Sequence, residues 1–232
     1  MLGLKYFNPQ NIKGNRETIK SYLEEEGASP VIKSGRAKDI ILKHIVDHEA
    51  KILDAAPGTG SLLESLFEAG FENLYGADID NYLKFTKLKE FQQTDFCFEK
   101  LPWPDKYFDA ITSFETIEHL ENPHNFIREI RRVLKDDGVF ILSMPNVQHI
   151  FNKIFFLRKG DMPRWRKNNN HISLFPLGVF QKSFLPYFEI KERGFFMGFF
   201  PYRFLSKLNI FPETELFAHT VYYIFKPKTV AQ

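Results

Sequence analysis

The chain has 232 residues, 44% of them hydrophobic, and a formal net charge of +2 at pH 7. This length is enough for one domain with a substantial core, and the near-neutral charge does not indicate a general binder of nucleic acid. The single cysteine, Cys97, excludes a disulfide framework and fits a reducing compartment. Because we recognise neither a signal peptide nor an apolar run of ~20 residues, we expect a cytoplasmic protein without a transmembrane segment.

The expected elements of the first 146 residues begin with helices and then alternate between strand and helix. Helices are expected from about residue 15 to 26 and from 38 to 48. Strands are expected near 51–56, 73–78, 92–96, 108–114 and 138–144, with helices between them and one helix over 123–134. This alternation is typical of a doubly wound α/β fold, a mostly parallel sheet with helices on both faces.

The last third of the chain has a different pattern. Residues 146–173 form a long polar and aromatic insertion, and residues 176–184 have helical spacing. Residues 188–196 and 219–225 alternate like strands, with an aromatic loop over 196–217 between them.

A glycine-rich turn follows the first expected strand. That strand ends near Asp54, and Gly58 and Gly60 permit the positive φ angles and close backbone approach that a ligand-binding turn needs. The free N–H groups of the next helix can bind a polar or anionic group. Asp78, at the end of the second strand, can accept hydrogen bonds from both hydroxyls of a ribose. The pattern predicts a nucleoside-binding βαβ unit, and Leu63 breaks the dinucleotide fingerprint.

Later segments carry a resemblance to a known family. They are Leu101-Pro102-Trp103-Pro104-Asp105, Glu118-His119-Leu120-Glu121-Asn122-Pro123, Arg128-Glu129-Ile130 with Val133-Leu134-Lys135, and Ser143-Met144-Pro145-Asn146. With these, the span from 51 to 146 resembles the class I S-adenosylmethionine-dependent methyltransferases. Within that family it looks most like the branch of ubiquinone-type and cell-surface-glycan-associated methyltransferases.

The resemblance implies a fold and a domain plan. It implies a Rossmann-like, seven-stranded, mostly parallel sheet with an antiparallel last strand, and S-adenosylmethionine as the cofactor. We expect a single methyltransferase domain over 1–232. Residues 1–50 would form a helical cap, 51–146 the cofactor-binding core, and 147–232 the substrate-side insertion and last strands.

The resemblance also implies which residues hold the cofactor. Four would form the first loop: Asp54, Ala56, Gly58 and Gly60. Asp78 would bind the ribose, with Ile79 against the adenine. The remaining residues would hold the adenine amino group (Asp95 and Phe96) and lie beside the methionine part (Phe114 and Glu115). The chain departs from the family at Ala56, where glycine is usual, and at Pro57, where cysteine is frequent.

Three residues are candidates for catalysis: Glu118, His119 and His171. Methyl transfer from a sulfonium is an in-line displacement in which the protein mainly positions the acceptor. An oxygen acceptor also needs a base, and a histidine directly after the fourth strand suits that role. His171 belongs to a His-Ile element that recurs after the insertion in the resembling enzymes. The alternative is structural, with Glu118 and His119 bracing the loop and His171 making a loop contact.

The same residues bear on metal binding. Glu115, Glu118 and His119, with the distant His171, are similar to the E-x-x-E-H plus histidine of divalent-metal-assisted methyltransferases. Such a set could hold Mg²⁺ and acidify an acceptor hydroxyl. Because Glu-His after the fourth strand is widespread in branches where no metal is expected, we predict no metal site.

The acceptor is less clearly indicated than the cofactor. We predict methyl transfer to an oxygen of a small molecule or a cell-surface glycan precursor. The basic and aromatic segment 157–167 fits an acidic or sugar-phosphate substrate, a nucleic acid or a membrane surface, but also a solvated loop with Trp165 packed down. RNA methylation, with or without a divalent metal, and a non-catalytic cofactor- or partner-binding relative therefore stay open. The sequence does not indicate the oligomeric state.

Overall fold

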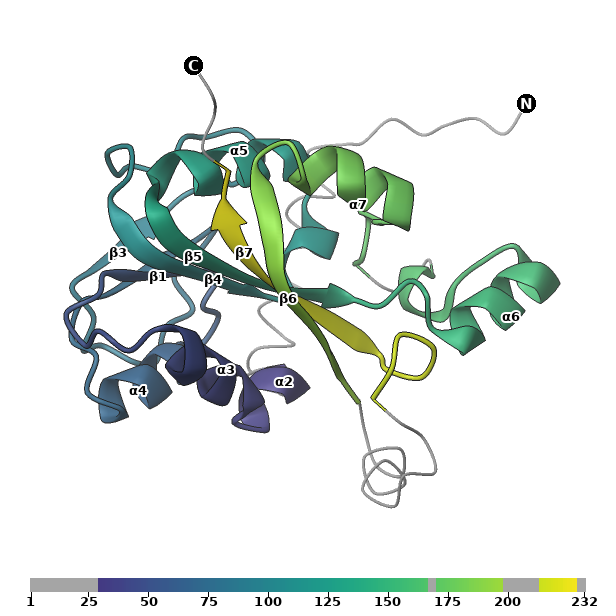
Figure 1. Cartoon of the computed structure of the whole chain (residues 1–232), viewed down its shortest axis with the longest axis horizontal. Coiled ribbons are helices and arrows are strands. Elements are labelled where there is room, and N and C mark those ends of the chain that lie inside the picture. Colours follow the sequence, from purple (N-terminus) through teal and green to yellow (C-terminus); the bar gives the residue numbers. More distant parts are fainter. Residues whose placement is uncertain (1–28, 167–169, 198–212, 229–232) are drawn as a thin grey trace.

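The computed structural model describes residues 29–166, 170–197 and 213–228, and within them one seven-stranded sheet forms the centre (Figure 1). The strands are β1 (Ile52–Ala55), β2 (Leu74–Asp78), β3 (Glu90–Gln93), β4 (Phe108–Phe114), β5 (Leu134–Pro145), β6 (Phe188–Phe196) and β7 (Thr220–Pro227). Their order is β3-β2-β1-β4-β5-β7-β6. The pairs from β3 through β5 are parallel, whereas β7 is antiparallel to both β5 and β6. The expected sheet and its antiparallel last strand are confirmed.

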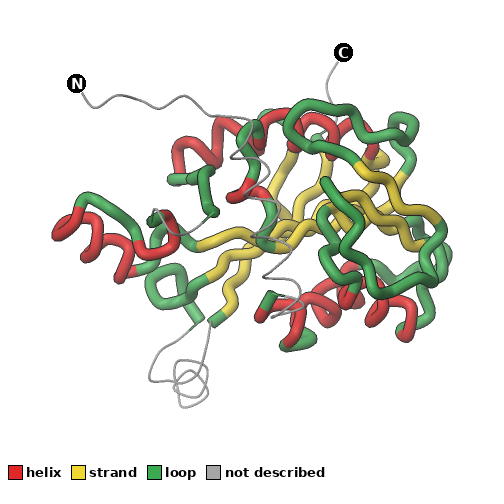
Figure 2. Tube along the Cα trace, turned by 180° about the vertical axis from the view of Figure 1, so that it is seen from behind, coloured by secondary structure: helices red, strands yellow, loops and turns green. Residues whose placement is uncertain are grey.

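Helices lie on both sides of this sheet, as Figures 1 and 2 show. One side carries α2 (Pro30–Lys33), α3 (Arg36–His44) and α4 (Ser61–Glu68), and the other carries α5 (Pro123–Val133) and α7 (Leu177–Phe184). The helix α6 (Ile150–Lys159) and two short 3₁₀ helices, η1 (Ile117–His119) and η2 (Pro163–Trp165), follow strands β4 and β5. None of the helices in the described ranges is long and apolar enough to cross a membrane.

The core is divided by the alternation of side chains along the strands. Ile52 and Ile141 face α3 and α4, whereas their neighbours Leu53 and Phe140 face α5 and α7. Strand β1 is buried along its whole length, as expected for a parallel strand covered on both faces. The doubly wound arrangement therefore follows from short, largely buried strands such as β1, β2 and β4, with helices packed on both faces of the sheet.

Helix α5 shows why its boundaries could be predicted. The side chain of Asn122 accepts a hydrogen bond from the backbone N–H of Asn125, and Pro123 occupies the first turn, where no N–H is needed. Phe126, Ile127 and Ile130 follow at helical spacing, so they share one face of the helix and are buried against the sheet.

Several expected boundaries are wrong. Helix α3 ends at 44 instead of 48, β5 begins at 134 instead of 138, and β3 covers 90–93 instead of 92–96. As a result, the residues expected at the end of the third strand lie in the turn beyond it. The expected helix at 15–26 and most of the aromatic loop lie outside the described residues.

Two expected helices are missing and two observed helices were not expected. Residues 79–89 and 94–107 contain no helix. In the first segment the side chains of Asp78 and Asn81 accept hydrogen bonds from nearby backbone N–H groups, which competes with a helix, and Pro102 and Pro104 interrupt the second. Helix α2, capped by Ser29, and helix α6, inside the insertion, were not anticipated.

Candidate functional site

The carboxyl ends of the central parallel strands place the predicted cofactor residues at one edge of the sheet. Strand β1 pairs with β2 and with β4, so Asp54, Asp78 and Glu115 all emerge on the same side. In an open α/β sheet this edge, between neighbouring strands, is where ligands bind.

The loop after β1 depends on glycine. Gly58 and Gly60 have φ angles of 53° and 83°, and Gly60 begins helix α4. A Cβ atom at Gly60 would lie 3.0 Å from Leu83 Cδ2 and 3.0 Å from Phe85 Cβ, closer than ordinary contact. The loop can therefore pass close to residues 83–85 only with glycine at this position.

Ala56 occupies a backbone conformation that suits glycine. Its φ is 68°, and its N–H donates to the carbonyl of Ala77 over 2.8 Å. A left-handed conformation costs an L-residue roughly 1–2 kcal/mol. The departure from the family at position 56 thus keeps the shape of the loop and adds local strain.

Two carboxylates beside this loop are held in a poorly hydrated environment. Burial raises the pKa of Asp54 to about 7, although Thr112 Oγ1 donates to Asp54 Oδ1 over 2.8 Å. Burial likewise raises the pKa of Asp78 to about 7, opposed by hydrogen bonds from the backbone N–H groups of Ile79 and Gly58. Two such carboxylates fit the hydroxyls and the positive charge of a nucleoside cofactor, which would favour their ionised forms.

The turn after β3 holds the residues expected to bind adenine. Asp95 Oδ1 accepts a hydrogen bond from Cys97 N over 2.9 Å, and Glu99 Oε2 accepts one from Asp95 N over 2.8 Å. Phe96 is buried and packs on Phe126, with ring centroids 5.2 Å apart. These contacts fix the turn, and contact of Asp95, Phe96 and Ile79 with adenine remains a prediction.

Glu115 is joined to the insertion by an ion pair. It follows the buried Phe114 at the end of β4 and has a φ of 52°. Its Oε2 lies 2.7 Å from Arg164 Nη2, and its Oε1 accepts from Ser143 Oγ over 3.3 Å. Sequence reasoning missed Arg164 because only the basic character of its segment could be recognised. That Phe114 and Glu115 lie beside the methionine part of the cofactor remains a prediction.

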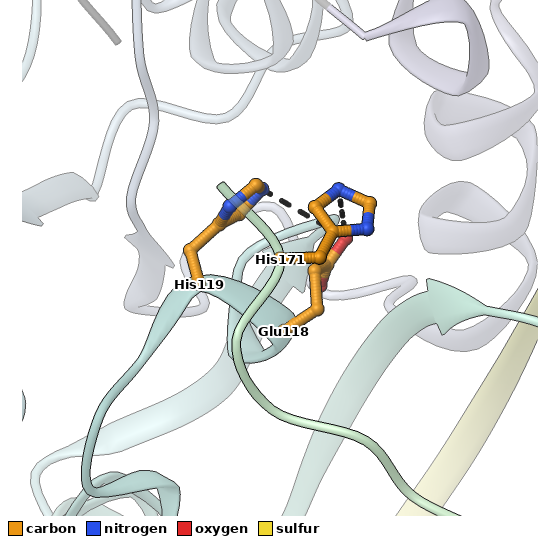
Figure 3. Close-up of side chains that lie close together, drawn as sticks. All are labelled: Glu118, His119 and His171. Atoms are coloured by element: carbon orange, nitrogen blue, oxygen red, sulfur yellow. Dashed lines mark ion pairs between the residues drawn. The ribbon is translucent and has the colours of Figure 1, made fainter. Parts of the chain in front are cut away.

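The three candidate catalytic residues lie together (Figure 3). Glu118 Oε1 is 4.0 Å from His119 Nε2 and 3.9 Å from His171 Nε2. The two imidazole rings meet edge to face with centroids 4.6 Å apart. Residues 118 and 119 belong to η1, and residue 171 lies at the end of the insertion. The fold therefore places His119 and His171 side by side although they are 52 residues apart in the sequence.

Backbone hydrogen bonds bring the end of the insertion to this place. The N–H groups of Ile172 and Ser173 both donate to the carbonyl of Glu118, over 2.8 and 2.9 Å. Ser173 Oγ donates to Leu120 O over 2.6 Å, and Trp165 Nε1 donates to Ser173 O over 3.0 Å. Trp165 is thus packed down over the cluster, with its ring 5.7 Å from that of His171.

Burial favours the uncharged forms of all three side chains in the cluster. Burial, with the nearby charge of Glu115, raises the pKa of Glu118 well above its usual range, and neither carboxylate oxygen has a hydrogen-bond partner among the described residues. Burial lowers the pKa of His119, and burial together with the charges of His119 and Arg164 lowers that of His171 to about 3. Both imidazoles are therefore neutral near pH 7.

One contact decides which nitrogen of His119 can act as a base. His119 Nδ1 lies 3.2 Å from the carbonyl oxygen of Asn170. Because a carbonyl only accepts hydrogen bonds, Nδ1 carries the proton and Nε2 keeps its lone pair. Nε2 faces Glu118 and can accept a proton or bind a cation.

The geometry also allows a metal ligand set. One ligand atom each from Glu118, His119 and His171 lies within 4.8 Å of the others. The fourth residue of the similar pattern, Glu115, is instead engaged by Arg164. The three side chains could therefore take up the proton that the methyl acceptor loses, or bind a cation. The predicted lack of a metal site stays a prediction.

Comparison with known proteins agrees with this geometry. A family model described as a methyltransferase domain matches residues 18–184. The chain belongs to this methyltransferase domain family. The match confirms the resemblance and, with the glycine loop and the carboxylates of Asp54 and Asp78, S-adenosylmethionine as the cofactor.

Individual relatives and solved structures are also similar to this chain, with modest sequence identity. An uncharacterized protein of Methanocaldococcus jannaschii is 35% identical over 55% of this chain and 49% of its own length. The ubiquinone biosynthesis O-methyltransferase of Glaesserella parasuis is 31% identical over 41% of this chain and 45% of its own length. The chain thus matches about half the length of these relatives. A Haloferax volcanii protein solved with the Trm112 methyltransferase activator shares the fold, with a TM-score of 0.63 at 16% identity over 92% of this chain and 99% of that chain.

Proposed function

We propose that this protein transfers the methyl group of S-adenosylmethionine to an oxygen of a small molecule or a cell-surface glycan precursor. The observation that carries the proposal is the neutral His119, with Nε2 unprotonated, beside the cofactor edge of the sheet. An oxygen acceptor must lose a proton during methyl transfer, and an imidazole near neutrality is suited to take it. The name of the Glaesserella relative, an O-methyltransferase, supports the same acceptor atom.

The cofactor residues would act by binding and orientation. Asp78 would accept hydrogen bonds from the ribose, and Asp54 would lie near the positive charges of the methionine part. When bound, S-adenosylmethionine supplies an activated methyl group on a sulfonium. The chain's own contribution is to hold the acceptor in line with that group and to keep water out.

The cluster of Glu118, His119 and His171 would accept the proton that the methyl acceptor loses. His119 Nε2 would receive it, and the positive charge of the resulting imidazolium would favour ionisation of Glu118, whose Oε1 lies 4.0 Å from that nitrogen. His171 would border the acceptor from the insertion side, beneath Trp165. The ion pair between Glu115 and Arg164 would keep the insertion over this site.

The proposal is tested by methyl transfer to two probe acceptors, 3,4-dihydroxybenzoate for phenols and UDP-N-acetylglucosamine for glycan precursors. His119→Ala should lower the rate roughly 10²–10⁴-fold while the affinity for S-adenosylmethionine stays the same. His124→Ala is the matched control, since His124 is exposed on α5. Equal rates for the wild type and His119→Ala would contradict a role for His119 as the base.

The same assay separates proton transfer by His119 from metal assistance. We propose that the metal-free protein is active, so EDTA should leave the rate unchanged. If EDTA abolished the rate and Mg²⁺ restored it, Glu118, His119 and His171 would instead be metal ligands, and the predicted lack of a metal site would be wrong.

RNA methylation is the second candidate. It is favoured by two basic side chains of the insertion, Arg164 beside the cluster and Arg166 over the ring of Phe155. RNA binding through such contacts weakens steeply with salt. Binding of a short RNA in a gel-shift assay at low salt, lost at high salt, together with methyl transfer to it, would favour this candidate over a small acceptor.

A further inference from the structure

Exposed apolar side chains are concentrated in one part of the described chain. Of the eleven large hydrophobic residues that are exposed, seven lie between residues 150 and 180: Phe151, Ile154, Phe156, Leu157, Ile172, Leu177 and Val179. Four of the seven are on α6. Exposed apolar side chains gathered on one helix indicate a surface that meets an apolar partner.

Helix α6 packs little against the rest of the described structure. Asn152 is its only buried residue, and Figures 1 and 2 show it reaching out from the carboxyl end of β5, apart from the helices that cover the sheet. Phe151, Ile154 and Leu157 recur at every third position, so they share one side of the helix. Their exposed fractions are 47%, 38% and 86%.

The sequence of this part of the insertion is rich in cations. Residues 150–167 contain six cations, Lys153, Arg158, Lys159, Arg164, Arg166 and Lys167, against one acid, Asp161. Lys153, Arg158 and Lys159 belong to α6 and are exposed beside the apolar side chains. Exposed apolar side chains together with Lys and Arg on one helix are suited to contact with the surface of an anionic bilayer.

We propose that α6 docks this protein on an anionic lipid surface. Phe151, Ile154 and Leu157 would enter the boundary between headgroups and acyl chains, while Arg158 and Lys159 meet lipid phosphates. A second copy of the chain fits less well, because a two-fold contact through α6 would bring two sets of the same cations together. RNA fits this side of the helix less well, because Phe151 is the one residue of the three with an aromatic ring on which a base could stack.

This docking would orient the site toward the membrane. Helix α6 and the cluster of Glu118, His119 and His171 both lie beyond the carboxyl ends of parallel strands, and η2 contacts both α6 and Glu115. The acceptor side would therefore be close to the bilayer. The proposal does not depend on which acceptor is used, and lipid binding can be measured without turnover.

The test is flotation of the whole protein with vesicles of phosphatidylcholine, with and without phosphatidylglycerol. The wild type should float with the anionic vesicles and much less with the neutral ones. Leu157→Glu and the double variant Arg158→Glu/Lys159→Glu should each weaken binding about tenfold or more. Val46→Glu is the matched control: Val46 is 81% exposed but precedes β1, at the opposite end of the sheet, so its binding should equal that of the wild type.

Calorimetric binding of S-adenosylmethionine by each variant shows that the fold and cofactor site are intact. This readout keeps failure of lipid docking distinct from failure of the proposed methyl transfer. Wild-type binding by both α6 variants, or no vesicle binding by the wild type, would overturn the proposal. Vesicle binding lost equally in Val46→Glu would do the same. A dimer in light scattering that Leu157→Glu dissociates, without vesicle binding, would assign the surface to a second copy.

Discussion

Glu115 and Arg164 form an ion pair of 2.7 Å that joins the loop after β4 to the insertion after β5. Arg164 also donates to the carbonyl of His219 over 3.2 Å, at the start of β7. One side chain thereby connects three segments at the carboxyl edge of the sheet. We expect this contact to set the position of the insertion over the candidate site.

Removing Arg164 should destabilise the protein. Arg164→Ala leaves the carboxylate of Glu115, with only 13% of its side chain exposed, without its cation. We expect a loss of about 1–3 kcal/mol in the free energy of unfolding, measured by urea denaturation. Arg166→Ala is the control: the exposed Arg166 stacks on the ring of Phe155, and its loss should cost less than about 1 kcal/mol. Equal losses in the two variants would contradict a special role for the ion pair.

Replacing Ala56 should stabilise the protein. Because Ala56 has a φ of 68°, Ala56→Gly should relieve strain and raise the free energy of unfolding by about 1 kcal/mol. The neighbouring Ala55→Gly should have the opposite sign, since Ala55 is a buried strand residue. Thermal unfolding of both variants tests the pair, and a lower melting temperature for Ala56→Gly would show that the loop is not strained there.

Cofactor binding should strengthen as the pH rises through 7. In the free protein the pKa values of Asp54 and Asp78 are raised to about 7, so both carboxyls are partly protonated below that pH. A cationic, hydroxyl-bearing cofactor favours the ionised forms and would release protons on binding. Calorimetry in two buffers with different ionisation enthalpies should show this release at pH 6 and little at pH 8.5. An affinity that does not change between these pH values would contradict the assignment.

The neutral histidines should make the fold sensitive to acid. The folded-state pKa values of His119 and His171 are lowered from 6.5, so the unfolded chain binds these protons more readily. Their contribution to stability is complete above pH 6.5 and is lost as the pH falls below it. The double variant His119→Gln/His171→Gln should therefore lose less stability than the wild type between pH 6.5 and 5, measured by chemical denaturation. A parallel pH dependence of both proteins would contradict the buried neutral state.

Much of the fold could be predicted because its elements are specified by patterns of neighbouring residues in the sequence. The apolar runs of β1, β2 and β4, the cap and spacing of α5, and the glycine loop need only neighbouring residues. The helix expected within residues 79–89 is missing because side chains there accept hydrogen bonds from the backbone. Helix α6 was missed because its apolar residues face outward, so its sequence lacks the pattern of a helix packed on the core.

The candidate site was predictable only in part. Asp54, Gly58, Gly60 and Asp78 follow strands in a fixed order, and that order indicates a nucleoside site. The approach of His171 to His119 was suggested by resemblance alone. The partnership of Arg164 with Glu115 has no local signal, because an ion pair across 49 residues depends on how the insertion folds back.

The most direct test of the account is calorimetric titration with S-adenosylmethionine of the wild type, Asp78→Ala and the control Asp47→Ala. Asp47 lies in the exposed turn before β1. We expect micromolar binding by the wild type and the control, weakened at least tenfold in Asp78→Ala. Failure of the wild type to bind, or equal binding by all three proteins, would contradict the cofactor site on which the proposed methyl transfer rests.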